Sequence, residues 1–220
     1  IAFLDGDGAV EVKQVGLGSL PGGGAEVFAQ PIRDVLCPEK LPPADWLRVM
    51  GEAHELGIPS NATMLYGHVE SAADRVDHML ALREQQDRTG GFMTFIPLAF
   101  HPRNTELAQA EAGRRFGTTA CEDLRTLAAG RLMLDNIPHV KAFWIMLGLS
   151  LAQMSQHWGA DDLDGTVVEE KITHSAGAET PQALTVEEIR GLVTSAGFDP
   201  QERNTVYRRV VREGARWHLE

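Results

Sequence analysis

The sequence predicts an α/β protein built on a parallel sheet or part of a barrel. Short apolar segments typical of buried strands alternate with amphipathic helices four or five times along the 220 residues. The spacings suit strand–helix–strand units, in which consecutive strands lie parallel. A closed (β/α) barrel of the TIM type has eight such units, so the chain is expected to form only part of one.

Composition narrows the class of protein. Hydrophobic residues make up 43% and charged residues 23%, as in soluble globular domains. The formal net charge of -11 argues against a nucleic-acid-binding surface or a polybasic membrane patch. No apolar run reaches the roughly 18 residues of a membrane span. The two cysteines, Cys37 and Cys121, stand far apart and are interpreted as reduced thiols of a cytoplasmic protein.

The stretch from Thr63 to Glu70 organises the chain. Ala62–Tyr66 is apolar and bounded by turn residues, which predicts a short buried strand. Gly67 then turns the chain, and His68 and Glu70 follow just past the carboxyl end of the strand. In barrels of alternating strands and helices, catalytic groups gather at that end.

The preceding glycine-rich stretch, 16–26, is not a dinucleotide-binding fingerprint, because Pro21 stands where the third glycine belongs. Its glycines either let the backbone approach a ligand closely or form a flexible surface loop. Both interpretations stay open at this point.

Cap signals and apolar spacing predict the other elements. Helices are expected after Pro43, Ser71, Thr119 and Thr185, and at 148–158; strands at 92–98 and 140–147; and a solvated terminal helix within 201–220. His54-Glu55 fails as a zinc motif, because Ile58 replaces its second histidine. The acids of 161–165 resemble part of a calcium loop, but the pattern is incomplete and predicts a turn with solvated carboxylates.

Six blocks, taken together and in order, resemble aminofutalosine synthase, a radical S-adenosylmethionine enzyme of menaquinone biosynthesis. They are Gly18–Glu26, Ala62–Glu70, Thr89–Phe92, Phe95–Pro102, Leu134–Ala142 and Asp164–His174, and the likeness extends from Gly16 to about Tyr207. The sister enzyme, cyclic dehypoxanthine futalosine synthase, shares the glycine-rich and Tyr-Gly-His blocks and remains the alternative. Leu98, His101 and His174 favour the first enzyme.

The resemblance implies a fold, cofactors and a reaction. Residues 16–220 would form the carboxyl-terminal units of a radical S-adenosylmethionine barrel with a terminal extension, after an atypical start at 1–15. A 4Fe–4S cluster, reduced by a donor such as flavodoxin or ferredoxin, would cleave S-adenosylmethionine. The 5′-deoxyadenosyl radical would then add to 3-[(1-carboxyvinyl)oxy]benzoate, giving aminofutalosine and carbon dioxide.

The cluster motif of the family, Cys-x-x-x-Cys-x-x-Cys, is expected before residue 1. Cys37 and Cys121 cannot hold a cluster alone. The resemblance therefore predicts that this chain, taken alone, does not generate the radical.

The resemblance also assigns cofactor residues. Glu26 is placed to bind the ribose or the amino group of S-adenosylmethionine, and Leu65 and Tyr66 to lie against its adenine. Gly67 makes the turn, and Glu70 supports this cofactor-binding segment as a structural residue.

Catalytic and substrate-binding roles carry open alternatives. His68 and His101 either act on the substrate or are hydrogen-bonded at strand ends. Lys141 either neutralises the benzoate carboxylate or pairs with Glu169 or Glu170. The remaining candidates for substrate contact are Asn104, Trp144, Glu169 and His174, with Arg203 as a carboxylate ligand or a surface residue.

Two other functions compete with this one. A metal-dependent hydrolase would use His68, His101, His139 and His174, although their spacings fit no ligand motif. A non-catalytic protein would bind adenosyl ligands or a partner without turnover.

Overall fold

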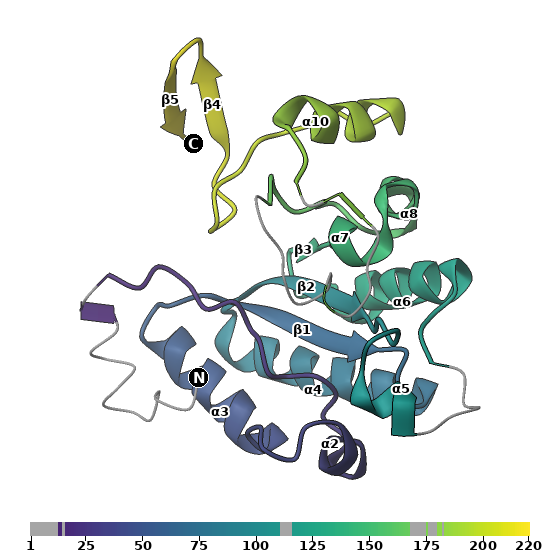
Figure 1. The fold of residues 1–220 in the computed structure, drawn as a ribbon. Helices are drawn as coiled ribbons and strands as arrows, with labels where there is room; N and C mark the ends of the chain where they lie inside the picture. Colours follow the sequence, from purple (N-terminus) through teal and green to yellow (C-terminus); the bar gives the residue numbers. More distant parts are fainter. Residues whose placement is uncertain (1–12, 15, 111–115, 168–174, 176–179, 182) are drawn as a thin grey trace.

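The computed structural model of the chain describes residues 13–14, 16–110, 116–167, 175, 180–181 and 183–220. Helices and parallel strands alternate through most of this part, which confirms the α/β class (Figure 1). The described strands do not close into a barrel. Their arrangement is compatible with part of one.

The sheet has three parallel strands in the order β1-β2-β3. They are β1 (Ser60–Tyr66), β2 (Phe92–Ala99) and β3 (His139–Val140). Two isolated bridges extend the sheet at its sides. Leu20 pairs in parallel with Ser60, and Lys141 pairs in parallel with Asp162. The carboxyl ends of all five neighbouring segments therefore meet at one edge.

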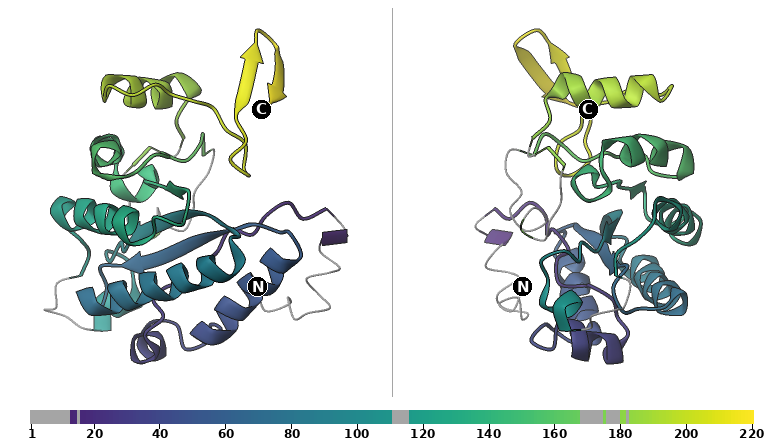
Figure 2. Two further views of the ribbon diagram at one scale, coloured as in Figure 1. Left: turned by 180° about the vertical axis from the view of Figure 1, so that it is seen from behind. Right: turned by 45° about the vertical axis from the view of Figure 1, so that its right-hand side comes forward.

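Helices cover the sheet and fill the connections between strands (Figures 1 and 2). They are α2 (Gln30–Leu36), α3 (Pro43–Glu55), α4 (Ala72–Thr89), α5 (Glu106–Ala110), α6 (Ala120–Met133), α7 (Trp144–Leu147), α8 (Leu149–Ser155), the 3₁₀ turn η1 (Gln156–Trp158) and α10 (Val186–Ser195). The chain ends in an antiparallel hairpin of β4 (Val210–Glu213) and β5 (Arg216–Leu219), which projects beside α10.

Reciprocal capping boxes start three helices, as the sequence predicts. Ser71 caps α4, Thr119 caps α6 and Thr185 caps α10, each paired with the acid three residues later. Each box satisfies backbone N–H groups that have no partner inside the helix.

Two predicted elements are wrong. The expected strand at 140–147 continues only briefly, and Trp144–Leu147 forms α7, because a short apolar run does not by itself distinguish a strand from a buried helix. The expected terminal helix is the β4–β5 hairpin. The prediction of a helix rested on the many arginines and overlooked the β-forming residues Val210, Val211 and Trp217. These residues flank a turn at Gly214, which has a φ of 66°.

The core lies between the sheet and the helices. Side chains alternate along β1, and Ala62, Met64 and Tyr66 on one side are fully buried. Asn61 and Leu65 on the opposite side remain partly exposed. Among the described helices, none is both long enough and apolar enough to cross a membrane.

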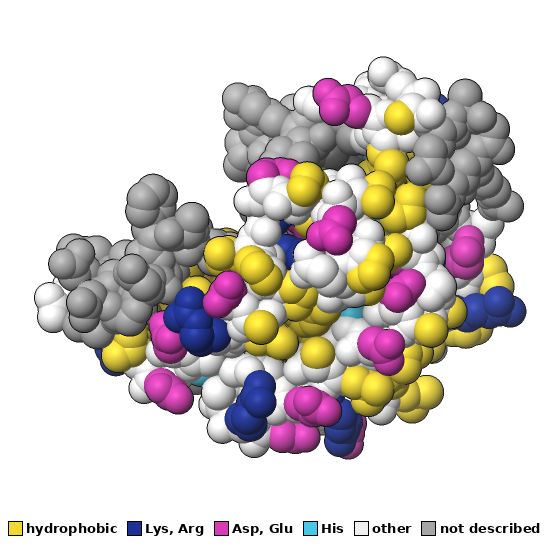
Figure 3. Space-filling view, turned by 90° about the horizontal axis from the view of Figure 1, so that it is seen from below, with side chains coloured by type: hydrophobic (Ala, Val, Ile, Leu, Met, Phe, Trp, Pro, Cys, Tyr) yellow, Lys and Arg dark blue, Asp and Glu magenta, His cyan; other side chains and the backbone are white. Residues whose placement is uncertain are grey.

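The lower face of the molecule mixes charges of both signs. Figure 3 shows apolar side chains near its middle, with acidic and basic side chains interspersed around them. On the described part of this face, basic side chains do not gather into the broad patch that binds nucleic acid.

A buried histidine links α4 to the sheet. His78 is fully buried, stacks on Phe28 at 4.0 Å between ring centroids, and its Nε2 lies 2.9 Å from the Thr63 carbonyl oxygen. Burial disfavours the charged imidazolium and lowers the pKa of His78 from 6.5 to about 3. His78 therefore stays neutral in the folded chain at moderately acid pH.

We predict that His78 makes stability fall on acidification. Below pH 6.5 His78 becomes protonated in the unfolded chain but stays neutral in the folded chain. Acidification therefore stabilises the unfolded state and lowers the free energy of unfolding. Between pH 7 and pH 5 this contribution amounts to about 2 kcal/mol and is absent from His78→Gln. Urea unfolding of both proteins at the two pH values measures it. An equal pH dependence in the two proteins would contradict the assignment.

Candidate functional site

The turn after β1 is held by a buried carboxylate. Gly67, with φ of 89°, donates its N–H to Glu70 Oε1 at 2.6 Å, and the His68 N–H donates to Glu70 Oε2 at 2.9 Å. Arg75 donates to Glu70 Oε1 from Nε at 2.8 Å, and the Glu70 side chain is fully buried. A Cβ at Gly67 would lie only 2.4 Å from Thr118 Cγ2. Glu70 thus acts on the turn as a structural residue.

The ring of His68 is also engaged inside this turn. Nε2 lies 3.0 Å from the Leu65 carbonyl oxygen, and the Val69 N–H donates to Nδ1 at 2.8 Å. Glu70 Oε2 stands 3.0 Å from the same Nδ1. Burial lowers the pKa of His68, although Glu70 opposes that shift, so we assign a neutral ring with its proton on Nε2. An action of His68 on substrate stays a prediction.

Leu65 and Tyr66 point to opposite sides of β1. The Tyr66 hydroxyl donates to Asp123 Oδ1 of α6 at 2.7 Å, and the Arg75 guanidinium lies 5.0 Å from the ring centroid. Burial, first of all, raises the pKa of Tyr66. The phenol therefore belongs to the helix layer, and only the backbone of Tyr66 remains for a ligand. The partly exposed Leu65 side chain lies on the other side.

The glycine-rich loop brings Glu26 beside this turn. The Leu65 N–H donates to the Glu26 carbonyl at 2.9 Å, and Glu26 Oε1 lies 2.5 Å from Lys40 Nζ. The loop runs alongside β1 and is fixed by its backbone contacts rather than free on the surface. Glu26, Leu65 and Gly67 are thus gathered at one end of the sheet.

The segment after β2 forms hydrogen bonds with α7 and with a residue later in the chain. His101 lies beyond the end of β2, with Nε2 3.0 Å from the Met146 carbonyl oxygen. Asn104 donates to the Ser175 carbonyl at 2.8 Å. Both contacts leave the predicted substrate roles untested. Glu169, Glu170 and His174 lie outside the described residues.

Lys141 carries a buried charge at the same edge. Its side chain is only 9% exposed, with Nζ 2.8 Å from Asp164 Oδ1 and 3.7 Å from Asp162 Oδ2. These two carboxylates stabilise the ammonium group, whereas the sequence pointed to Glu169 or Glu170. Lys141 is therefore paired in this structure by acids that the sequence assigned to solvent.

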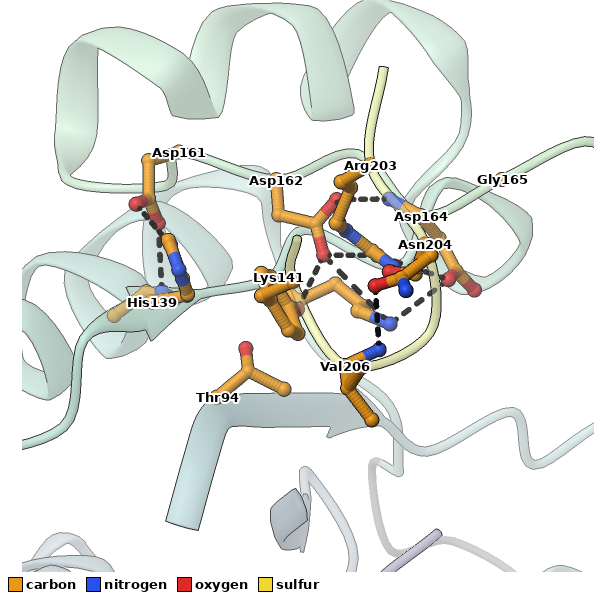
Figure 4. A network of polar contacts seen from close by, with 12 residues as sticks. Thr94, His139, Lys141, Asp161, Asp162, Asp164, Gly165, Arg203, Asn204 and Val206 are labelled. Atoms are coloured by element: carbon orange, nitrogen blue, oxygen red, sulfur yellow. Dashed lines mark hydrogen bonds and ion pairs between the residues drawn. The ribbon is translucent and has the colours of Figure 1, made fainter. Parts of the chain in front are cut away.

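Asp162 is the centre of a charged network that also binds the tail (Figure 4). Arg203 Nη2 and the Tyr207 hydroxyl each lie 2.6 Å from Asp162 Oδ2. Burial alone would raise the pKa of Asp162, but Lys141 and Arg203 hold it below its usual range. Tyr207 also stacks on His139, with 4.1 Å between the ring centroids.

The neighbouring Asp161 carboxylate is likewise engaged in hydrogen bonds. It accepts from His139 Nδ1 at 2.8 Å, from the Val140 N–H at 2.7 Å and from Arg131 Nη2 at 2.6 Å. The prediction of solvated acids at 161–165 is therefore wrong for Asp162, whose side chain is only 9% exposed, whereas the Asp161 side chain is 41% exposed. The sequence missed Asp162 and Tyr207 because their partners are distant in the chain, and the run of acids, interpreted as a turn, gave no local signal of burial.

Trp144 lies in the core. Its side chain is fully buried, and Nε1 donates to the Gly165 carbonyl at 3.2 Å. The indole thus anchors the loop that carries Asp164. Its proposed contact with substrate has no exposed ring surface to support it.

A cleft of about 780 Å³ opens beside the network, between α10, the 159–166 segment and the 198–209 segment. The cofactor candidates Glu26, Leu65 and Gly67 do not line it. Across the described part of the chain, no three His, Cys, Asp or Glu side chains come together as metal ligands. The two described cysteines are free thiols, Cys37 buried and Cys121 exposed.

Comparison with known proteins decides the family. The family model for the CofH/MqnC C-terminal region matches residues 89–214. The chain belongs to the CofH/MqnC family. Its resemblance to the futalosine-pathway synthase is also confirmed, because the aminodeoxyfutalosine synthase of Thermus thermophilus is 51% identical over 199 residues.

Curated synthases and transferases are similar to most of the chain. The Thermus match covers 90% of the chain and 53% of that relative. The aminodeoxyfutalosine synthase of Streptomyces coelicolor is 46% identical over 92% of the chain and 54% of its own length. A 5-amino-6-(D-ribitylamino)uracil–L-tyrosine 4-hydroxyphenyl transferase of Methanosarcina acetivorans is 42% identical over 90% of the chain and 54% of that protein. The chain thus spans about half the length of these curated relatives.

We predict that Asp162→Asn destabilises the chain by about 3 kcal/mol, since it leaves Arg203 and Lys141 short of a buried counter-charge. The matched control is Asp199→Asn, at an exposed position in the same part of the chain, with a change within about 0.5 kcal/mol. Thermal and urea unfolding measure both variants. A loss at Asp162 no larger than the loss at Asp199 would show that the network contributes little.

Proposed function

We propose that the complete protein to which this chain belongs is an aminofutalosine synthase. It would add the 5′-deoxyadenosyl group of S-adenosylmethionine to 3-[(1-carboxyvinyl)oxy]benzoate, releasing carbon dioxide. One observation supports this function best. Neighbouring parallel segments end at one edge of the sheet, and their ends carry Glu26, Leu65, Gly67 and Lys141. A cytoplasmic location and an electron donor such as flavodoxin or ferredoxin belong to the same proposal.

The described residues fit S-adenosylmethionine, which would supply the adenosyl group that is transferred. Leu65 offers a partly exposed apolar side chain beside a turn that tolerates no Cβ at Gly67. Glu26 presents a carboxylate, 15% exposed, at the end of the adjoining loop. We propose that Leu65 packs against adenine and that Glu26 accepts hydrogen bonds from the ribose or the amino group.

The described cysteines do not fit a 4Fe–4S cluster. Cys37 is buried and Cys121 is exposed, and neither belongs to a group of ligands. The cluster would need cysteines from elsewhere in the complete protein. We therefore propose that this chain alone binds ligands without turnover.

Lys141 is proposed to bind a substrate carboxylate. The Asp164 carboxylate lies 2.8 Å from Nζ, and this contact supports the proposal that a carboxylate can pair with the ammonium group. The side chain of Asp164 is 23% exposed, so its place is partly open to solvent. In this account the substrate carboxylate replaces Asp164 while Asp162 keeps its contact with Arg203.

The experiment is a turnover assay on the complete protein with its cluster in place. We predict aminofutalosine and carbon dioxide from S-adenosylmethionine and 3-[(1-carboxyvinyl)oxy]benzoate. Lys141→Met should lower kcat/KM at least about tenfold, the value of a lost charged hydrogen bond, while Lys13→Met leaves it unchanged. Mass spectrometry of the products measures both variants.

Other products would redirect the assignment. Turnover of the sister enzyme's substrate, or of tyrosine with 5-amino-6-(D-ribitylamino)uracil, would replace the proposed reaction by that of another branch. The tyrosine reaction is worth including because a relative bearing that name is 42% identical to the chain. Binding of adenosyl compounds with no product in any assay would favour a non-catalytic protein. Turnover that requires added zinc would favour the hydrolase.

A further inference from the structure

The Asp162 carboxylate accepts a hydrogen bond at each position that it offers. Oδ2 accepts from Arg203 Nη2 at 2.6 Å and from the Tyr207 hydroxyl at 2.6 Å. Oδ1 accepts from Arg203 Nε at 3.3 Å and from the Asp164 N–H at 3.1 Å. A carboxylate oxygen has about two lone-pair positions, so these donors fill the group. All of them except the Asp164 N–H come from the tail.

Lys141 is left outside this set of donors. Its Nζ lies 3.7 Å from Asp162 Oδ2, beyond hydrogen-bond distance, but only 2.8 Å from Asp164 Oδ1. The Tyr207 hydroxyl bonds to the same oxygen, Oδ2. Tyr207 and Lys141 therefore compete for one acceptor, and Tyr207 holds it in this structure. Among the described residues, Asp164 is consequently the one carboxylate that accepts a hydrogen bond from Lys141.

A turn in the tail holds Tyr207 at this acceptor (Figure 4). Asn204 Oδ1 accepts from the Val206 N–H at 3.1 Å and from the Arg208 N–H at 2.9 Å. The Asn204 N–H donates in return to the Arg208 carbonyl at 2.9 Å. Within this turn Tyr207 has a left-handed φ of 61°, which a bulky residue rarely adopts. Such strain persists where the surrounding contacts impose it, and it is concentrated at functional sites.

Two neighbours fix the Tyr207 ring. It stacks on His139 with 4.1 Å between the ring centroids and 13° between the planes, and the Arg203 guanidinium lies 4.2 Å from its centroid. Burial, first of all, and the Asp162 charge raise the pKa of Tyr207, so the hydroxyl keeps its proton and acts as a donor. The orientation of this donor is thus set by the tail and by His139, not by Lys141.

We propose that Tyr207 is a positioning residue for the substrate carboxylate, because its hydroxyl keeps Asp162 from bonding to Lys141 and leaves the ammonium group to the ligand. This inference rests on the proposed function, in which a substrate carboxylate replaces Asp164 at Lys141. If Asp162 also bonded to Lys141, the ligand would compete with two carboxylates instead of one. Tyr207 therefore acts on ligand affinity through Asp162 and Lys141, without touching the ligand.

The first test is a crystal structure of the complete protein carrying Tyr207→Phe, without substrate. Loss of the hydroxyl frees one position on Asp162 Oδ2, so Lys141 Nζ should approach that oxygen to about 3 Å. A distance that stays near 3.7 Å would overturn the inference. The unmodified protein is the control, and a direct hydrogen bond from Lys141 to Asp162 in its crystal structure would overturn the inference as well.

Calorimetric titration of the complete protein measures the effect on binding. Tyr207→Phe should weaken binding of 3-[(1-carboxyvinyl)oxy]benzoate about tenfold and leave the affinity for S-adenosylmethionine unchanged. In the turnover assay, KM for the benzoate substrate should rise while kcat stays within about twofold, because the lost interaction stabilises the bound substrate and the transition state alike.

Arg212→Met is the matched control in the tail. It removes the ion pair with Glu202 and leaves the donors of Asp162 in place, so it should change neither affinity. Equal weakening of both ligands by Tyr207→Phe would indicate a general loss of structure and would overturn the positioning role.

A second substitution tests whether Tyr207 acts through Asp162. In the Asp162→Asn background no carboxylate at this position can bond to Lys141, so adding Tyr207→Phe should change the benzoate affinity by less than about twofold. A loss of about tenfold in that background as well would show that Tyr207 acts by another route. The crystal structure and the titration of Tyr207→Phe decide the inference even if the Asp162→Asn protein fails to fold.

The outcomes separate this inference from the proposed function. Approach of Lys141 to Asp162 in Tyr207→Phe, with a selective loss of benzoate binding, supports the inference even where no aminofutalosine forms, and then only the proposed reaction fails. Formation of aminofutalosine with an unchanged KM in Tyr207→Phe supports the reaction and overturns the role of Tyr207. Absence of benzoate binding by the unmodified protein would overturn both.

Discussion

The constraint on which the structure depends is the parallel pairing of neighbouring segments, which aligns their carboxyl ends. β1 and β2 pair over seven registered positions, and single bridges add Leu20 on one side and Asp162 on the other. Because neighbouring strands are parallel, each connection must carry the chain back to the starting end of the next strand. It does so through the helices that cover the sheet. The glycine-rich loop, the Gly67 turn, His101 and the Lys141 network are consequently neighbours at one edge, although they are distant in sequence.

Buried charges then hold the ends of these segments. Glu70 fixes the Gly67 turn through two N–H groups and Arg75, while Asp162 joins Lys141 to Arg203 and Tyr207 of the tail. Breaking one such pair is costly because it strands the other charge away from water. The tail is therefore tied to the sheet by its arginine and tyrosine, not by a helix.

Local signals predicted part of this arrangement. The capping boxes at Ser71, Thr119 and Thr185 and the strands around Met64 and Phe95 follow from short-range patterns, and the structure bears them out. The partners of Lys141 and Asp162 do not, because side chains 20 to 45 residues apart meet only through the fold. Arg33 was missed for the same reason, since its guanidinium contacts three carbonyls before α2 and the Leu41 carbonyl after it.

A crystal structure of the complete protein with S-adenosylmethionine bound would test the central claim most directly, namely that this edge of the sheet is the ligand site. The account predicts adenine against Leu65 beside the Gly67 turn, with Glu26 within hydrogen-bond distance of the ribose or the amino group. An adenosyl group in the cleft beside α10, or anywhere else away from the carboxyl end of β1, would contradict it.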